Sequence, residues 1–270
     1  LPASFHAEGV SSCVNLDEEL LYTAKMKELD GFCSKNAVTP VQYDKGERVI
    51  GSRWVVTHPN DNSVKCRCVA TEVAHTVADA TLFANVPSLT TLKTFLGAAS
   101  AQMQDLHQKR RKGKAVLLDV SKAFLNTPIE LMPGERRVLM RAPKEAALPP
   151  GWAWQCNSSM YGLRRSPASW NRFFKKLMKK WGFRVSRADP SLFVSSDGSV
   201  RVLCYVDDLL ITGDENLVDE FVKLLRSEHD TSEPIELRNS GDKGKILGRT
   251  LIKTARGFVM QTDPKHAMAV

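Results

Sequence analysis

The sequence predicts an α+β fold in which short apolar strands interleave with amphipathic helices. Three observations predict it: two apolar, strand-like runs at residues 200–213, helical periodicity at residues 88–106 and 214–229, and the absence of a long βαβ repeat. A doubly wound parallel sheet needs that repeat. We therefore expect an antiparallel sheet packed on helices, within a chain of 270 residues that is long enough for one large core or two smaller ones.

The N-terminal third predicts one helix and one hairpin. Residues 1–40 are polar, with a helical stretch at 17–29 that has a single apolar face. Residues 41–70 alternate in the manner of paired strands around a turn at 59–62. Ser88 then has the position of an N-cap for the next helix. The apolar side of that helix consists of Leu92, Phe95, Leu96, Ala99, Met103 and Leu106.

Positive charge gathers at two places. The helix after Ser88 ends in a basic run at 109–112, which complements a helix C-terminus and can also contact nucleic acid. Ser166 and Pro167 predict an N-cap and a first-turn proline for another helix. Its aromatic stripe is typical of a buried face, and the chain from residue 164 to 187 contains no acidic residue. That unbroken charge suits contact with phosphates. The stripe consists of Trp170, Phe173, Phe174, Leu177 and Trp181.

The most informative motif is the tip of the predicted hairpin, Tyr205-Val206-Asp207-Asp208. Two adjacent carboxylates beside apolar strands repel each other unless a cation neutralises them, and Mg²⁺ prefers such oxygens. The alternative is that both are ordinary turn residues. Asp119 ends a further apolar strand at 115–120. If that strand lies beside the hairpin, Asp119 and Asp207 can hold two metal ions; otherwise Asp119 only caps a turn.

After the hairpin, residues 214–229 predict a helix, and residues 245–252 and 257–260 predict strands. The apolar face of that helix consists of Leu217, Val218, Phe221, Leu224 and Leu225.

Five blocks of sequence follow one another along most of the chain. The blocks are Val64-Lys65-Cys66-Arg67-Cys68-Val69-Ala70, the nine residues from Leu118 to Asn126, Met160 to Pro167 with Trp170, Tyr205 to Gly213, and Ile246 to Arg249. In this order they resemble the reverse transcriptase of Ty1/copia-type LTR retrotransposons. The resemblance covers roughly residues 45–265, and an ordered set is far more specific than one motif.

The resemblance implies an RNA-directed DNA polymerase with the right-hand fingers and palm, in which two metal ions catalyse nucleotidyl transfer of dNTPs onto a primer 3′-hydroxyl. It implies two Mg²⁺ ions, with Mn²⁺ possible, held by Asp119, Asp207, Asp208 and the backbone carbonyl of Val120. Asp119 and Asp207 are the leading ligands, and Asp208 supports them.

The resemblance also implies the residues that bind the substrates. Phe124 falls where the family has a bulky residue that excludes a ribose 2′-hydroxyl. The predicted nucleotide-binding residues are Lys65, Arg67, Phe124, Tyr161 and Gly162. The predicted nucleic-acid-binding residues are Tyr205, Arg164, Arg165, Leu247 and Gly248.

The implied division of the chain alternates between fingers and palm. We expect an N-terminal extension at 1–40, fingers at 41–114, palm at 115–130, a return to the fingers at 131–168, palm with the catalytic hairpin and primer grip at 169–252, and the start of a truncated thumb or connection at 253–270. No RNase H signature follows, so a piece of a retrotransposon polyprotein that lacks RNase H and most of the thumb is expected.

Departures from the family leave other functions open. Arg165 stands where family members commonly carry Gln, Met160 stands where they carry Leu, and residues 72–87 lack the usual Gly-Phe-x-Gln. One alternative is a catalytically inactive remnant of the transposable element that only binds nucleic acid. A metal-dependent nuclease is the other, but it leaves Lys65, Arg67 and Phe124 unexplained.

Composition agrees with these expectations. The net charge of +8 suits an RNA/DNA template-primer duplex and dNTPs as partners. The sequence has neither an apolar stretch of membrane-span length nor a signal-peptide pattern, so an intracellular location, a cytoplasmic particle or the nucleus, and no membrane partner are expected. The six cysteines suggest free thiols. A zinc site at Cys66 and Cys68 with His58 and His75 lacks the usual spacing. No oligomeric state is predicted.

Overall fold

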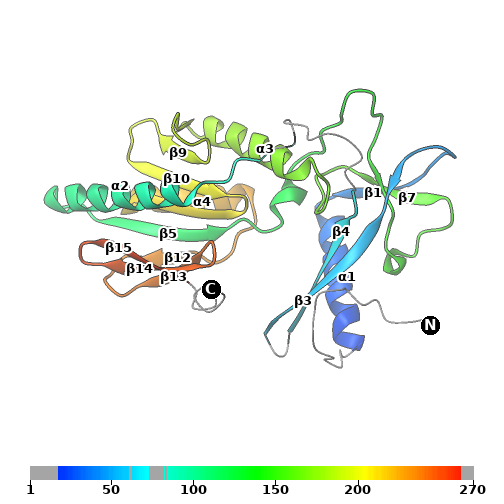
Figure 1. The fold of residues 1–270 in the computed structure, drawn as a ribbon, viewed down its shortest axis with the longest axis horizontal. Coiled ribbons are helices and arrows are strands. Elements are labelled where there is room, and N and C mark those ends of the chain that lie inside the picture. The colour runs from blue at the N-terminus through cyan, green and yellow to red at the C-terminus, as the bar shows by residue number, and fades with distance from the viewer. Residues whose placement is uncertain (1–17, 61–62, 73–81, 83, 263–270) are drawn as a thin grey trace. The chain divides into compact units, whose positions relative to one another are not determined.

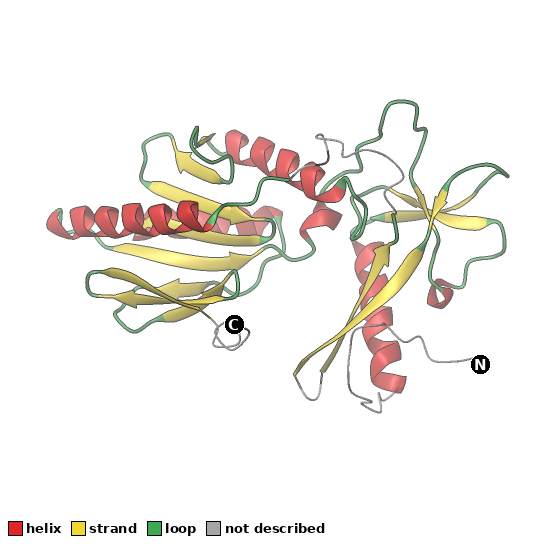
Figure 2. Cartoon of the chain, viewed as in Figure 1, coloured by secondary structure: helices red, strands yellow, loops and turns green. Residues whose placement is uncertain are grey.

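The structure is a computed structural model that describes residues 18–60, 63–72, 82 and 84–262. Its secondary structure confirms an α+β fold with helices and several antiparallel sheets (Figures 1 and 2). The chain divides into two compact units, each with its own hydrophobic core. The first holds the described residues of 1–82 and 124–169, and the second those of 83–123 and 170–270.

The first unit contains one long helix, a four-stranded sheet and the predicted hairpin. The sheet order is β1-β7-β6-β2, and β3 pairs with β4. The helix predicted at 17–29 is confirmed and continues to Ser34. The elements are α1 (Glu18–Ser34), β1 (Val38–Gln42), β2 (Val49–Ile50), β3 (Ser52–Asn60), β4 (Ser63–Ala70), β6 (Leu139–Met140), β7 (Trp152–Cys156), and the 3-10 turns η2 (Ala123–Asn126) and η3 (Lys144–Ala146).

Charged, exposed side chains alternate with buried thiols along strand β4. Cys66 and Cys68 are buried, while Lys65 and Arg67 between and beside them are exposed. Successive side chains of a strand point to opposite faces, so the thiols face the core and the cations face away from it. Burial raises the pKa of both thiols, that of Cys68 to about 12, which keeps them protonated rather than in the thiolate form that binds zinc.

A glycine allows a close approach of two backbones in the same unit. Gly162 has φ +83°, and the amide of Ala70 in β4 donates to the carbonyl oxygen of Tyr161 at 2.7 Å. A Cβ atom on Gly162 would lie 2.0 Å from the carbonyl oxygen of Ala70. Only glycine therefore fits both the conformation and the space.

The second unit is built on a six-stranded antiparallel sheet of order β12-β5-β11-β10-β9-β8, with a separate three-stranded sheet β13-β14-β15. Its elements are α2 (Leu89–Gln108), β5 (Gly113–Asp119), α3 (Ser166–Lys180, whose first four residues belong to the first unit), β8 (Phe183–Val185), β9 (Leu192–Ser195), β10 (Val200–Tyr205), β11 (Asp208–Asp214), α4 (Glu215–Glu228), β12 (Ile235–Leu237), β13 (Lys243–Ile246), β14 (Arg249–Thr254) and β15 (Gly257–Thr262).

Helix α2 covers one face of the six-stranded sheet (Figure 1). The register aligns Leu117, Leu210 and Leu203 in a row across β5, β11 and β10, and all three belong to the core that α2 shares. The predicted N-cap is confirmed, since Ser88 Oγ accepts a hydrogen bond from the Thr91 amide. All six predicted apolar positions of α2 are buried.

The two compact units do not coincide with the segments predicted as fingers and palm, and they do not test that division. Residues 83–123, which include α2 and β5, lie in the second unit, and residues 124–169 lie in the first. Helix α2 lies in the same unit as β5 because its apolar face packs on β5, β10 and β11. The division of the chain into fingers and palm stays a prediction.

Three details of the predicted elements differ from the structure. Ser166 is the first residue of α3, and its hydroxyl donates to the Met160 carbonyl oxygen at 2.6 Å rather than capping the helix. The strand predicted at 245–252 is two strands, because the chain turns at Leu247 and Gly248. The helix predicted at 214–229 is confirmed as α4 with Asp214 as N-cap, although Leu224 is exposed.

We predict that Gly162→Ala destabilises the first unit by about 3 kcal/mol. The left-handed conformation costs an alanine roughly 1–2 kcal/mol, and forcing a methyl group against the Ala70 carbonyl adds roughly 1–3 kcal/mol. Gly151→Ala is the matched control, because Gly151 has φ +81° but nothing within 4 Å of the added Cβ. Denaturant unfolding of both variants measures the difference. Equal losses of stability would contradict the close-packing role of Gly162.

Candidate active site

The site is built on the ends of two neighbouring strands in the second unit. Strands β10 and β11 form the predicted hairpin, in which Tyr205 lies opposite Asp208 and the loop is Val206-Asp207. Strand β5 pairs with β11 on its other side, and Asp119 lies opposite Asp208. The strand that carries Asp119 therefore lies beside the hairpin, which the sequence left open, and three carboxylates share one end of the sheet.

The hairpin loop is held in a strained conformation. Val206 has φ +57°, which a β-branched residue rarely adopts. The indole Nε1 of the buried Trp170 donates to the Val206 carbonyl oxygen at 2.5 Å, and the Val120 amide donates to the Asp207 carbonyl oxygen at 2.9 Å. Such strain persists only where surrounding contacts over-determine it. Trp170 and Val120 supply those contacts, so the direction of Asp207 is fixed from both sides.

The end of β5 is fixed in the same way by a segment that sequence reasoning missed. The Asp119 amide donates to Ser232 Oγ at 3.0 Å, and the Ser232 amide donates back to the Asp119 carbonyl oxygen at 2.8 Å. The Ser121 amide donates to the Asp230 carbonyl oxygen at 2.9 Å. Residues 230–232 are polar and show neither helical nor strand periodicity. The sequence therefore gives no sign that this segment holds the end of β5 in place.

The carboxylates influence one another electrostatically. Partial burial, together with the negative charges of Asp207 and Asp119, raises the pKa of Asp208 to about 6. In the described part of the chain, no three His, Cys, Asp or Glu side chains are already arranged around a point where a metal ion would fit. The donor set nevertheless suits a hard divalent cation, because it consists of carboxylate oxygens whose mutual repulsion a cation would relieve.

A hollow of about 410 Å³ adjoins Asp208. Tyr205, Leu247 and Gly248, three of the predicted nucleic-acid-binding residues, line it together with Asp208. Leu247 and Gly248 form the two-residue loop between β13 and β14, with φ +53° and +68°. Positive φ at both positions is typical of a type I′ hairpin turn. This turn therefore places its backbone beside the end of the carboxylate-bearing hairpin.

The predicted nucleotide-binding residues form one connected set in the first unit. The guanidinium of Arg67 lies 5.8 Å from the centre of the Tyr161 ring, and that ring lies 5.5 Å from the ring of Phe124 in an edge-to-face contact. Lys65 is exposed on the same side of β4 as Arg67. Gly162 supports the set by letting the Tyr161 backbone reach β4.

The two arginines that were predicted to bind nucleic acid differ in their surroundings. Arg164 is partly exposed, and its amide donates to Glu72 Oε2 at 2.8 Å. Arg165 is 5% exposed, and its guanidinium donates to both carboxylate oxygens of Glu135, at 2.5 and 2.8 Å, and to the Glu130 carbonyl oxygen. Its charge is paired with the partly buried carboxylate of Glu135, which explains how the chain accommodates arginine here. That Arg165 binds nucleic acid stays a prediction.

Comparison with known proteins agrees with this architecture. The sequence model of the family described as "Reverse transcriptase (RNA-dependent DNA polymerase)" matches residues 35–264. The chain belongs to the reverse transcriptase family. More narrowly, it is a reverse transcriptase domain of the copia type of retrotransposon, as its curated relatives show.

Two of these relatives are polyproteins of transposons. The chain is 24% identical to the retrovirus-related Pol polyprotein from transposon TNT 1-94 of Nicotiana tabacum, over 88% of this chain and 17% of that protein. It is 25% identical to the Transposon Ty1-OR Gag-Pol polyprotein of Saccharomyces cerevisiae, over 96% of this chain and 15% of that protein. The chain thus spans less than a fifth of the length of these relatives.

A solved structure of telomerase from Candida albicans, in complex with a fragment of telomeric RNA, aligns with a TM-score of 0.48 and 8% identity, over 89% of this chain and 51% of that chain. Separately, none of the helices in the described residues combines the length and apolarity needed to cross a membrane.

We predict that Val206→Gly stabilises the second unit by about 1 kcal/mol. Glycine adopts the positive φ without strain, and this gain exceeds the roughly 0.5–1 kcal/mol of entropy that it loses on folding. Val194→Gly, at an extended position of β9, serves as control and should destabilise the unit. Thermal unfolding measures both changes. A loss of stability in Val206→Gly as large as in the control would show that the turn is not strained.

We also predict that the stability of the unit falls as pH rises from about 4 to 6. Asp208 binds its proton more tightly when folded, since burial and the neighbouring charges raise its pKa from 3.8, the ordinary value, to about 6. Its contribution is thus fully present below pH 4 and lost as pH rises through 6. Melting temperatures of wild type and Asp208→Asn across pH 4–7 test this: the variant should lack the fall. Parallel curves would refute the perturbed carboxyl.

Proposed function

We propose that the chain is the core of an RNA-directed DNA polymerase that transfers dNTPs onto the 3′-hydroxyl of a primer. The observation that carries the proposal is the pairing of Asp119 with Asp208 beside the fixed Asp207 loop. In-line phosphoryl displacement by two metal ions needs ligands that can hold the ions about 3.5–4 Å apart, and carboxylates from neighbouring strands suit that need. Family membership supports the reaction class.

The proposed metal ligands are Asp119, Asp207 and the carbonyl oxygen of Val120, with Asp208 in support. When bound, Mg²⁺ or Mn²⁺ ions would lower the pKa of the primer 3′-hydroxyl and stabilise charge on the pyrophosphate leaving group. The chain's own contribution is to hold the ligands in place. Trp170 and Ser232 fix the backbone on either side of the carboxylates, so little rearrangement of the main chain accompanies ion binding.

The remaining residues would bind substrates. Lys65 and Arg67 would neutralise the triphosphate of the incoming nucleotide, because both are exposed cations on one side of β4. Phe124, half-buried against Tyr161, would exclude a 2′-hydroxyl and so favour deoxynucleotides. Tyr205, Leu247 and Gly248 would hold the primer end beside Asp208. Arg164 would contact the template, and the partner would be an RNA/DNA template-primer duplex.

A second candidate is nucleic-acid binding without synthesis. One observation favours it: the side chains of the described residues do not already surround a metal position. Under this reading the basic surface of the chain is functional, and the carboxylates are not.

Primer extension separates the two candidates. We predict that wild-type protein extends oligo(dT) on poly(rA) with Mg²⁺ and dTTP, and that Asp207→Asn lowers extension by at least about 10³-fold because a metal ligand is lost. Binding of the duplex should change little. Asp105→Asn, a charge-matched change on the exposed side of α2, is the control and should retain wild-type extension. Extension by Asp207→Asn at the wild-type rate would show that synthesis does not need Asp207 as a metal ligand.

If wild type and Asp105→Asn both bind the duplex with a salt-dependent affinity but neither extends it, the second candidate is correct.

A further inference from the structure

A second hollow lies at the opposite end of β5 from the carboxylates. Its volume is about 750 Å³, within the range of ligand-binding pockets. It is lined by the last turns of α2, the start of β5, the start of α4 and the turn between β14 and β15. Gly113 at its wall precedes Asp119 by six positions of extended strand, or about 20 Å. The hollow is therefore separate from the candidate active site.

The lining of this hollow is strongly basic. Of the described residues that line it, one is acidic, Glu215, and that carboxylate is already paired with Arg238. The residues that can carry positive charge are His107, Arg111, Lys112, Arg238, Lys253 and Arg256. They come from three separate parts of the chain, so the concentration of charge arises only in the folded unit.

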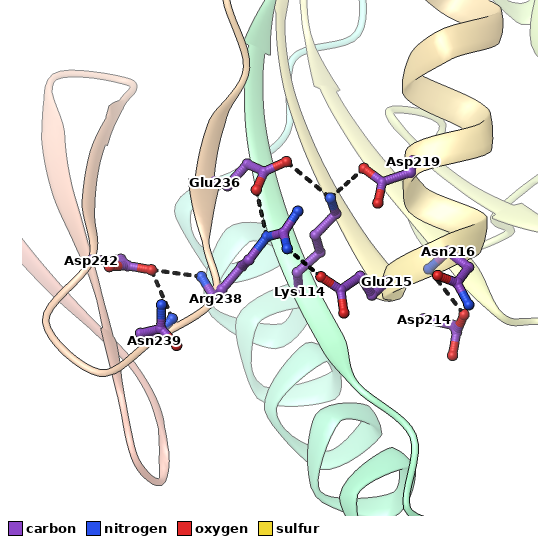
Figure 3. Close-up of polar contacts among 9 residues, drawn as sticks. All are labelled: Lys114, Asp214, Glu215, Asn216, Asp219, Glu236, Arg238, Asn239 and Asp242. Carbon is purple, nitrogen blue, oxygen red and sulfur yellow. Dashed lines mark hydrogen bonds and ion pairs between the residues drawn. The ribbon is translucent and has the colours of Figure 1, made fainter.

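Two of the arginines are held in place by acidic neighbours. Figure 3 shows Arg238 between Glu236 and Glu215, and Glu236 also accepts from the buried Lys114 at 3.0 Å. Arg111 Nε lies 2.9 Å from Asp214 Oδ2. An arginine has five N–H donors, so these pairs position the guanidinium groups while leaving other donors for a ligand. The walls of the hollow are therefore pre-organised.

The other cations have no such neutralising partner. Lys112 and Arg256 are exposed, and neither forms an ion pair with the residues that the structure describes. Lys253 is partly buried, which lowers its pKa; its ammonium donates to the Thr254 carbonyl oxygen and lies 5.4 Å from the Phe258 ring, and it forms no ion pair with a carboxylate of the described residues. A partly desolvated cation without an anion is unfavourable unless a ligand supplies the negative charge.

Complementing the C-terminus of α2 does not account for this arrangement. Helix α2 ends with backbone bonds from Lys109 to Asp105 and from Arg111 to Leu106, and cations from the run 109–112 already lie at its end. Lys253 and Arg256 belong to β14 and its following turn, about 145 positions later in the chain. Their presence in the same hollow is what a ligand with several negative charges would require.

We propose that this hollow binds phosphate groups of a nucleic-acid strand at a place distinct from the site of synthesis. Exposed Arg110 extends the positive charge outward from Arg111 and Lys112, whereas Lys109 beside it is paired with Asp105. The basic surface is thus longer than a single phosphate needs. A strand of repeating phosphates matches such a surface better than a free anion does. The inference concerns binding alone and does not depend on whether the chain synthesises DNA.

The test is the salt dependence of binding to fluorescein-labelled oligo(dT), measured by anisotropy with the full chain and without Mg²⁺ or dNTP. The variant carries Lys112→Gln and Arg256→Gln, both at exposed positions. Loss of two phosphate contacts should make the slope of log affinity against log salt shallower by about 1.4 and weaken binding about tenfold near 0.1 M salt. The control carries Lys45→Gln and Lys223→Gln, which remove the same charge from exposed positions elsewhere.

The control should keep the wild-type slope. Each single substitution, Lys112→Gln or Arg256→Gln, should change the slope by about half as much, which keeps the test valid if the double variant folds poorly. Equal slopes for variant and control would overturn the proposal. So would a variant whose oligo(dT) slope is unchanged but whose binding of inorganic tripolyphosphate, measured by calorimetry, is lost, because the hollow would then be a site for free phosphate. A lower melting temperature with an unchanged slope would assign these residues to stability and overturn it equally.

Discussion

The pairing of β5 with β11, which sets Asp119 opposite Asp208, is the constraint on which the rest of the second unit depends. Burial of Asp208 and its repulsion by Asp207 and Asp119 oppose this pairing, and both raise the pKa of Asp208. The opposing stabilisation comes from the leucine row beneath, Leu117, Leu210 and Leu203, and from the core that α2 adds to it. The apolar sheet therefore holds together charges that would separate if they were free.

The charged side chains at the two ends of β5 have different neighbours. At one end Lys114, fully buried, is matched by Asp219 and Glu236 (Figure 3). At the other end three carboxylates lie close together, and the charges of Asp207 and Asp119 contribute to the raised pKa of Asp208. Perturbed carboxylates of this kind cluster at functional sites, whereas Lys114 is matched by acidic side chains of the protein itself. The contrast separates the structural ion pairs of this unit from its candidate active site.

Much of this could be predicted from the sequence, because the signals are local. The periodicity of α2, the Ser88 cap and the hairpin that carries Asp207 all depend on neighbours in the chain. Contacts between distant parts of the chain could not be predicted. Arg165 is buried because Glu135 accepts its charge, α2 lies in the same unit as β5 because the two share a core, and Ser232 acts through bonds to the backbone that any polar loop residue could make. Composition and spacing contain none of these pairings.

The pairing of Asp119 with Asp208 has a consequence for how the protein is made. Because 208 − 119 = 89, Asp119 leaves the ribosome 89 residues before its partner. At a synthesis rate of about 5–20 residues per second, the edge of β5 that pairs with β11 stays unpaired for several seconds. Contacts of such long sequence separation also form slowly, since a large loop has to close first. The carboxylate-bearing end of the sheet is thus among the last features to assemble, and a nascent chain is exposed to strand-to-strand aggregation until β11 is synthesised.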